Sequence, residues 1–572
     1  MSDLAVQAYQ LTAAGRFAEA LPLAQSAVAG LRVCTPTHGM LATILLRLGR
    51  RREAELVVQQ ALDYSEGSAD AYDALAHVSA LLGQHERANA LYRRVVELAP
   101  NDPRFWHNLA SSERSLGRLR EAEEACDRTI ALDRTRYATF LLRSELRVQT
   151  SDANHVDELQ RELSRNSSDD RARMFLGYAL AKELDDLQRY DEAFPHLAAA
   201  SAIRRRHLAY NVEMDCRKLE RIAAVFPKDL IRGAMTHSKG LDRDDAAMSP
   251  KEFIRSEATR HPKGHDRGDA EMSPKDLNPG ESAMHPKELD RGDAAMFPKE
   301  FNRGGETDSP KEFISGVAAS PRESVHDAAA GSRHIFIVGL PRSGTTLLEH
   351  MLLGLAGVRS NGETENFSQA LLAAAPRDRG DVFAGAAAAE SAAVARGYER
   401  LAGGDATADR VIEKLPMNYL YLGAIHRALP GAKLVLVNRD PVDSCFAMYR
   451  ILFGEAYPFS YDFDDLAKYY AAYERLMDHW RASLGEALYE VSYEDLVREP
   501  ARVGEGVAKY CGLEWNERAV EVHKRASVSL TASAAQVRRP IYGSSSGRWR
   551  RYEKHLEPLI HALRRERVIS SC

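Results

Sequence analysis

The fold of the second half of this chain depends on the segment His334-Ile-Phe-Ile-Val-Gly339-Leu-Pro-Arg342-Ser-Gly344-Thr-Thr346-Leu-Leu-Glu-His-Met-Leu352. It opens with a short β-branched and aromatic run, which is typical of a buried parallel strand. A glycine-containing loop follows, and the residues after the loop have the spacing of an amphipathic helix. Strand, glycine loop and helix in this order point backbone N–H groups and a helix dipole at an anion. The segment therefore predicts an α/β domain with an anion-binding loop.

The loop differs from that of nucleoside triphosphatases at one position. Its two glycines are five residues apart, as in GxxxxGK[ST], and Thr346 stands at the Ser/Thr place. Thr345 stands where those enzymes have a lysine, so a main support for the β- and γ-phosphates is missing. Arg342 offers instead a planar guanidinium that suits a pair of phosphosulfate oxygens. We therefore expect a donor in which one phosphate is bonded to one sulfate, and no bound Mg²⁺.

A second apolar run, residues 433–438, ends in Arg439, and a predicted helix follows it. This order places a cation at the carboxyl edge of a parallel sheet, where ligands of α/β proteins bind. Between the two runs lies Gly362-Glu363-Thr-Glu365. Glu363 could accept the proton of an acceptor hydroxyl, with Glu365 in reserve. The alternative is a glutamate that satisfies the dipole at a helix N-terminus.

Pro-Arg342-Ser-Gly344-Thr-Thr-Leu-Leu after a hydrophobic strand resembles the 5′-phosphosulfate loop of sulfotransferases that use 3′-phosphoadenosine-5′-phosphosulfate (PAPS). The resemblance is strongest to the tyrosylprotein type and to bacterial proteins that join tetratricopeptide repeat (TPR) units to such a domain. It covers about residues 333–560. It implies that the loop grips the donor through Arg342, Ser343, Gly344, Thr345 and Thr346.

The resemblance also implies the catalytic groups. Glu363 corresponds to the family's proposed base in a similar Gly-Glu context. Lys414, in Glu413-Lys414-Leu-Pro, resembles a lysine that stabilises the bridging oxygen as adenosine bisphosphate leaves, and Arg342 stabilises charge beside it. A salt-bridged lysine at a strand end is the alternative for Lys414.

The family holds the donor's 3′-phosphate with an arginine and a serine eight residues later. Arg439 fits the arginine, but Ala447 stands at the serine place, whereas Ser444 is five residues on. Either one hydroxyl contact is missing, or Ser444 supplies it from a neighbouring turn.

Two later segments complete the resemblance. Tyr493 would border the nucleotide, with a buried core tyrosine as the alternative. Residues 531–542 and Gly547-Arg548-Trp549 resemble a family segment that leads to Lys-Trp, so Arg548 would contact the donor. The arginine-rich stretch 538–551 is predicted to be a basic lid over the nucleotide, or else a solvated loop.

The first segment of the chain repeats every 34 residues. The repeats are marked by Gly15, Gly49, Gly83 and Gly117, each followed five residues later by an alanine. Glycine takes the left-handed conformation that ends a helix, and the small alanine lets the next helix pack closely. These units resemble TPRs, and a degenerate unit over 175–197 adds an insertion between its helices. A solenoid of this kind offers a concave surface to a protein or peptide, or serves as a self-contained scaffold.

The middle segment has a different composition. Pro-Lys pairs recur every 12 residues from Pro250 to Pro310, among many charged and few apolar residues. Such units cannot bury a core, so a disordered linker is expected. Neither a metal-binding nor a catalytic spacing is present there.

Composition bears on nucleic-acid binding, membrane association and cellular compartment. The net charge of −5 gives no global basic field for nucleic acid or anionic membrane. No apolar run is long enough to span a membrane, and no signal peptide is recognisable at the N-terminus. The six cysteines are scattered without metal-like spacing, which favours a reduced, cytoplasmic compartment. Cys445 is expected to be a buried bystander.

Together these patterns predict a multidomain chain: a TPR helical domain with its cap over 1–226, a linker over 227–332 and a parallel-sheet sulfotransferase domain over 333–572. The expected activity is sulfuryl transfer from PAPS, without a metal, to a hydroxyl of a protein tyrosine or a carbohydrate. Two alternatives are a P-loop nucleotide kinase and a TPR scaffold whose nucleotide-binding domain is inactive.

Overall fold

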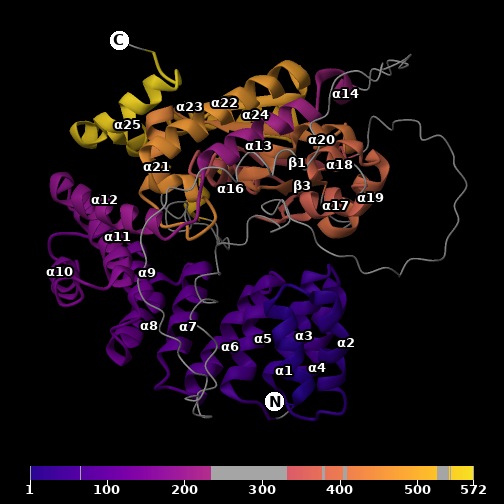
Figure 1. Ribbon diagram of the computed structural model, residues 1–572, viewed down its shortest axis with the longest axis vertical. Helices are drawn as coiled ribbons and strands as arrows, with labels where there is room; N and C mark the ends of the chain where they lie inside the picture. Colours follow the sequence, from indigo (N-terminus) through magenta and orange to yellow (C-terminus); the bar gives the residue numbers. More distant parts are fainter. Residues whose placement is uncertain are drawn as a thin grey trace, which may run out of the picture.

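The computed structural model describes residues 2–64, 66–232, 331–376, 381–403, 409–524, 540–541 and 543–570. The predicted linker falls mostly outside these ranges, as do residues 531–539 of the family-like C-terminal segment. In the described part, helices of the first half lead into a C-terminal domain built on a parallel sheet (Figure 1). The predicted fold class is confirmed.

Helix pairs form the N-terminal region. Their bounds are α1 (Asp3–Ala13), α2 (Phe17–Val28), α3 (Pro36–Arg47), α4 (Arg51–Leu62), α5 (Ala69–Leu81), α6 (His85–Leu98), α7 (Pro103–Leu116), α8 (Leu119–Leu132) and α9 (Tyr137–Glu145). The four repeat glycines lie between paired helices with φ of 73–79°. The alanines five residues later are at most 1% exposed. The expected roles of glycine as helix terminator and alanine as packing contact are both confirmed.

The degenerate unit differs from its prediction. It is the pair α11 (Asp170–Asp186) and α12 (Tyr190–Arg206), joined by a turn of ordinary length in which Gln188 takes φ 60° in place of a glycine. The inserted element is instead α10 (Val156–Arg165), which precedes the pair. The expected insertion between the two helices is therefore wrong.

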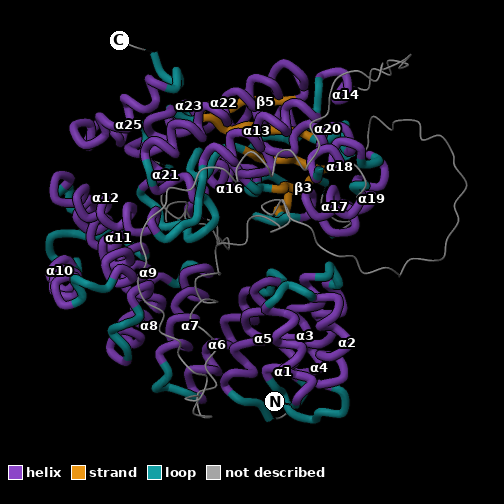
Figure 2. The backbone as a smooth tube through the Cα atoms, viewed as in Figure 1, coloured by secondary structure: helices purple, strands orange, loops and turns teal. Residues whose placement is uncertain are grey.

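The C-terminal domain contains one five-stranded parallel sheet in the order β2-β3-β1-β4-β5. The strands are β1 (His334–Val338), β2 (Val358–Ser360), β3 (Arg410–Glu413), β4 (Lys433–Asn438) and β5 (Leu488–Ser492). Helices flank the strands in Figure 2. All five residues of β1 are buried, as the β-branched run predicts. Because β1 is central, the loop that follows it opens at the middle of the carboxyl edge.

Helices bury both faces of this sheet. Alternate residues of β1 and β4 enter two separate apolar cores, since side chains of a strand point to opposite faces. One core is formed with α16 (Thr345–Leu352) and α24 (Pro500–Cys511). The other contains α17 (Asn366–Ala374), α18 (Val382–Ala388), α19 (Ser391–Ala402), α20 (Leu422–Ala428), α21 (Pro441–Tyr449), α22 (Phe463–Leu484) and α25 (Glu553–Arg565). The small helix α23 (Tyr493–Arg498) follows β5.

The second core continues into the helical region. Buried residues of α11, α12, α13 (Val212–Val225) and α14 (Lys228–Arg232) belong to it. Trp480 of α22 is fully buried there and lies against Phe226. Figure 1 shows α13 lying along the C-terminal domain. Residues 170–232 therefore share an apolar core with one face of the sheet.

None of the described helices is both long and apolar enough to cross a lipid bilayer.

Candidate active site

The carboxyl ends of the strands bring the predicted residues to one edge of the sheet. Glu363 follows β2, Lys414 follows β3, the loop 339–344 follows β1, Arg439 follows β4 and Tyr493 follows β5. Parallel strands end at the same edge, which is where α/β folds bind ligands. Segments that are far apart in the sequence therefore contribute to a single site.

The loop after β1 has a backbone suited to glycine at both ends. Gly339 has φ 151° and Gly344 has φ 105°, while Arg342 takes φ 68°, which is uncommon for a residue with a side chain. A Cβ on Gly339 would lie 2.5 Å from the carbonyl oxygen of Val437, and one on Gly344 would overlap the Tyr493 ring. Both glycines are thus required by close packing as well as by φ.

The end of the loop leads directly into α16. Thr345 and Thr346 form the first turn of this helix and are buried, and no side chain caps its N-terminus. Ser343 is also buried, and among the described residues its Oγ has no hydrogen-bond partner. A buried hydroxyl without a partner is unfavourable unless a ligand satisfies it. The helix N-terminus and this hydroxyl together have the properties of an anion site.

Gly344→Ala should destabilise the domain. The new methyl group meets Tyr493 and the backbone must hold φ 105°, so we expect a loss of about 2–4 kcal/mol in unfolding free energy, measured by calorimetry. Gly403→Ala is the matched control, because Gly403 also has positive φ but open space around it. Equal losses in the two variants would contradict the close-packing argument.

Lys414 is buried between two carboxylates. Its Nζ is paired with Glu363 Oε1 and lies 3.6 Å from Glu349 Oε2. Ser360, at the end of β2, donates to Glu349 Oε1 at 2.5 Å. Burial opposes the charged form of Lys414, but the two carboxylates outweigh it and raise its pKa. Lys414 is therefore an ammonium ion at neutral pH.

A second buried glutamate shapes the segment that carries Glu363. Glu413 accepts hydrogen bonds from Asn361, from Thr364 at 2.6 Å and from Asn366 at 3.3 Å. Burial raises the pKa of Glu413, and these donors oppose that rise. The contacts fix the turn 361–366 against the end of β3, which directs Glu363 toward Lys414.

The two candidate bases, Glu363 and Glu365, differ in position and contacts. Glu365 stands at the N-cap position of α17 without a side-chain hydrogen bond to the helix, and its Oε1 is buried with no hydrogen-bond partner among the described residues. Burial raises the pKa of Glu365. Glu363 lies before the helix, is paired with Lys414 and is 22% exposed.

Arg439 contacts the loop after β1, the segment around Ser545 and the ring of Tyr493. Its Nη1 donates to the carbonyl oxygen of Arg342 at 2.9 Å, and its Nη2 donates to that of Ser545 at 2.6 Å. Its guanidinium lies 4.6 Å from the ring centroid of Tyr493. The same ring packs against Gly344. Arg439 and Tyr493 therefore border the loop, while the contacts with the donor expected for both stay predictions.

Helix α21 carries Ser444 and Ala447, the two positions considered for a hydroxyl contact with the 3′-phosphate. Ser444 is buried in its first half, whereas Ala447 is partly exposed. Cys445 is fully buried, which raises the pKa of its thiol and fits a bystander role.

Arg548 lies in the short helix η9 (Arg548–Tyr552) and is bonded to Asp185 of α11. Asp443 of α21 accepts the backbone N–H groups of Gly547 and Trp549 and so fixes the start of η9. The expected lid over 538–551 is described only in part, since residues 538, 539 and 542 lie outside the described ranges.

Three carboxylates near these groups were not anticipated from the sequence: Glu349, Asp443 and Asp185. Glu349 lies on the apolar face of the helix after the loop, and a charged residue in that position could have indicated a buried ion pair. Asp443, in Arg439-Asp-Pro-Val-Asp443, is an acidic residue within the motif itself. The sequence around Asp185 gives no indication of its contacts, because its partners lie far away in the chain. Within the described ranges, no group of three or more His, Cys, Asp or Glu side chains could hold a metal ion.

Comparison with known proteins agrees with the division of the chain into a repeat region and a C-terminal domain. The sulfotransferase family model matches residues 334–517, and tetratricopeptide repeat models match residues 69–112 and 103–136. An uncharacterized protein of Aquifex aeolicus (strain VF5) is 32% identical over 244 residues, which are 40% of this chain and 32% of that protein. The chain thus spans about a third of the length of the curated relative it matches.

Two solved structures are similar at low identity. A sulfotransferase domain from the curacin biosynthetic pathway is 17% identical and covers 40% of this chain and 96% of its own, with a TM-score of 0.28. Sulfotransferase STF1 from Mycobacterium tuberculosis H37Rv is 17% identical and covers 37% of this chain and 77% of its own, with a TM-score of 0.26. By the family matches, the chain carries TPR repeats followed by a sulfotransferase-family domain.

Proposed function

We propose that the chain transfers a sulfuryl group from PAPS to an acceptor hydroxyl. The observation that carries the proposal is the convergence of the loop 339–344, the Lys414–Glu363 pair and the Arg439–Tyr493 pair at one edge of the sheet. An anion site, a carboxylate and buried cations at one place are the groups that transfer between two oxygens requires.

The residues at this edge fit the donor. The α16 N-terminus and the unpartnered Ser343 Oγ suit the phosphosulfate group. Arg439 Nε is also buried without a hydrogen-bond partner among the described residues, which suits a further phosphate. The remaining proposed donor contacts are those of Thr345, Thr346, Ser444, Tyr493 and Arg548. The loop offers no lysine for a triphosphate, which disfavours the nucleotide kinase alternative.

The proposed reaction forms a bond between the acceptor oxygen and sulfur, and breaks the bond between sulfur and the bridging phosphate oxygen. Glu363 takes the proton of the acceptor hydroxyl. Lys414 and Arg342 stabilise the charge that develops as adenosine 3′,5′-bisphosphate leaves. The hydrogen bond from Gly339 N to Pro416 O, at 3.2 Å, joins the loop to the segment that carries Lys414. Lys414 thus lies between the donor loop and the base.

The acceptor is proposed to be a tyrosine of a protein or a carbohydrate, and the concave TPR surface to bind a protein or peptide partner. The tyrosylprotein subtype, the domain limits 1–226, 227–332 and 333–572, and a cytoplasmic location stay predictions.

Adenosine 3′,5′-bisphosphate should raise the melting temperature of the full chain in the absence of Mg²⁺. We expect a rise of several degrees at 100-fold excess over Kd, since such an excess stabilises by about 2.7 kcal/mol. ATP with Mg²⁺ is the control and should give a smaller shift. No shift with the bisphosphate would contradict the proposal.

Turnover distinguishes the enzyme from an inactive scaffold. Labelled PAPS is offered with tyrosine peptides and glycans in parallel, and transfer to either supports the proposal. Donor binding without transfer to any acceptor would favour the scaffold with an inactive domain.

A further inference from the structure

One buried carboxylate of the helical region reaches the C-terminal segment. Asp185, at the end of α11, is 2% exposed at its side chain. Its Oδ2 accepts from Arg548 and, at 2.7 Å, from Arg450, and its Oδ1 accepts from the Tyr552 hydroxyl at 2.7 Å. Burial opposes the ionisation of Asp185, but the two arginines outweigh it and lower its pKa. An ionised carboxylate from the repeat region therefore holds three side chains of the C-terminal domain.

The segment around Arg548 is held from two sides. Ser545 O accepts from Arg439, and Asp443 accepts the N–H groups of Gly547 and Trp549. Asp185 holds the same segment from the other side through Arg548 and Tyr552. The segment therefore connects the residue proposed to bind the 3′-phosphate with the helical region.

The charges in this cluster do not balance. Arg450 and Arg548 contribute two positive charges and Asp185 one negative charge. The neighbouring Asp186 also attracts both arginines, but it is paired with Lys182 at 2.7 Å, so an excess of one positive charge remains in a largely buried place. Arg450 and Tyr552 would suffice to occupy both oxygens of Asp185, so Arg548 is a second cation on Oδ2. The Nε of Arg548 is buried, and no described residue accepts its hydrogen bond. A surplus cation with an unsatisfied donor is suited to an anionic ligand.

From this geometry we infer that Asp185 is a positioning residue of the donor site: it fixes the guanidinium of Arg548 for a phosphate of the bound nucleotide. The inference rests on the proposed function. It makes the last helix pair of the repeat region part of the donor site.

Asp185→Asn should weaken the binding of adenosine 3′,5′-bisphosphate, measured by calorimetric titration of the full chain. The expected rise in Kd is about tenfold, since an arginine without its partner samples other rotamers. Turnover at saturating PAPS should change by less than about twofold, because the base and Lys414 are untouched. A merely structural role would lower the melting temperature and leave Kd unchanged.

A double-mutant cycle tests whether Asp185 acts through Arg548. Arg548→Gln alone should weaken binding at least as much as Asp185→Asn. In the Arg548→Gln background, Asp185→Asn should have no further effect on Kd. Full additivity of the two losses would overturn the inference.

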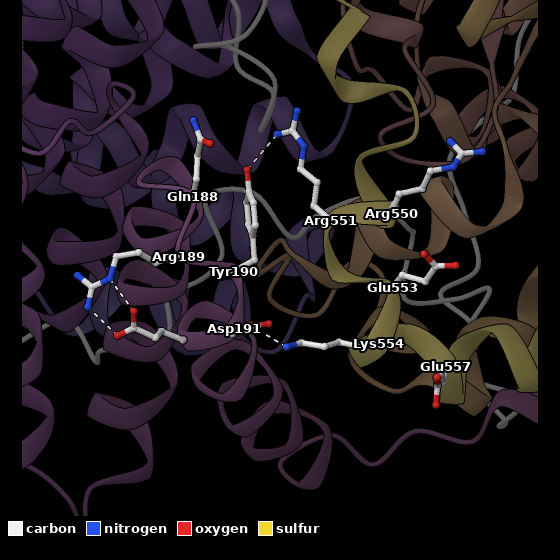
Figure 3. Close-up of a pocket in the computed structure, with 10 residues that line it drawn as sticks. Gln188, Arg189, Tyr190, Asp191, Arg550, Arg551, Glu553, Lys554 and Glu557 are labelled. Atoms are coloured by element: carbon white, nitrogen blue, oxygen red, sulfur yellow. Dashed lines mark hydrogen bonds and ion pairs between the residues drawn. The ribbon is translucent and has the colours of Figure 1, made fainter.

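The same interface offers a matched control. Asp191, at the start of α12, pairs with Lys554 at 2.7 Å and with His555 at 2.9 Å. Figure 3 shows Asp191 and Lys554 facing each other beside Tyr190 and Arg551. These four residues line a pocket of about 710 Å³. Asp191→Asn removes a contact between the same two parts of the chain without touching Arg548, so Kd should stay unchanged. An equal rise in Kd in this variant would overturn the inference.

A milder variant serves if Asp185→Asn does not fold. Tyr552→Phe keeps the ring and removes one hydrogen bond to Asp185, and it should raise Kd about threefold in the wild-type background only. No rise, or the same rise in the Arg548→Gln background, would overturn the inference. Wild-type binding is measured first: its failure contradicts the proposed function, whereas wild-type binding with an unaltered Asp185→Asn variant contradicts only the role of Asp185.

Discussion

Glu363→Gln should lower the rate of sulfuryl transfer by about 10²–10³-fold while the bisphosphate product still binds. Glutamine keeps the size of the side chain but cannot take the proton of the acceptor hydroxyl, and general base catalysis contributes a factor of this order. The measurement is the single-turnover rate with labelled PAPS at saturating donor and acceptor. Product affinity is measured by calorimetric titration in parallel.

Glu365→Gln is the matched control for this prediction. Glu365 lies two residues later at the N-cap position of α17, whereas Glu363 is the residue paired with Lys414, so the Glu365 variant should keep most of the activity. The opposite pattern, with activity lost in Glu365→Gln and kept in Glu363→Gln, would make Glu365 the base. A loss of product binding in Glu363→Gln would instead give that residue a role in the donor site.

Lys414→Met should lower both stability and activity. Lys414 is 1% exposed, and its removal leaves the carboxylates of Glu349 and Glu363 facing each other without a cation. Breaking a buried ion pair in this way costs about 3–5 kcal/mol. We therefore expect a lower melting temperature of the C-terminal domain by calorimetry, together with a large loss of turnover at temperatures where the variant is folded.

Two further variants separate charge from packing at this position. Adding Glu349→Gln to Lys414→Met removes one of the two unpaired carboxylates and should restore part of the lost stability. Lys433→Met replaces a lysine at the start of β4, where Nζ lies over the ring of Tyr510 at 5.1 Å, and should cost less than about 1 kcal/mol. If Lys414→Met were no more destabilising than Lys433→Met, the buried cluster would have little energetic weight.

The site follows from the sheet order in a way that single motifs do not reveal. The motifs of β1 and β4 each predict a binding loop, because each combines a buried strand with a glycine or an arginine at its carboxyl end. Which motifs become neighbours depends on the order β2-β3-β1-β4-β5, which sets Lys414 and Arg439 on opposite sides of the central loop. Strand order depends on pairing between residues far apart in the sequence, so it cannot be read from local patterns.

Features that depend on a few neighbouring residues can be predicted from the sequence. The 34-residue step predicts the helix pairs, because a glycine with positive φ ends each first helix and a small alanine admits the second. The run 334–346 predicts the central strand and the anion-binding loop for the same local reason, as β-branched residues favour a buried strand and the glycines permit the turn. These elements require no knowledge of the rest of the chain.

Which charged side chains become neighbours depends on the packing of distant segments. Lys414 pairs with Glu363 and Glu349 across more than 50 residues, and Asp185 meets Arg548 across 363 residues. A buried ion pair forms only where packing brings two groups out of water together, and no local pattern records that event. The loop that defines the fold can therefore be recognised in the sequence, whereas the contact of Asp185 with Arg548 depends on the apolar core that the repeat region shares with one face of the sheet.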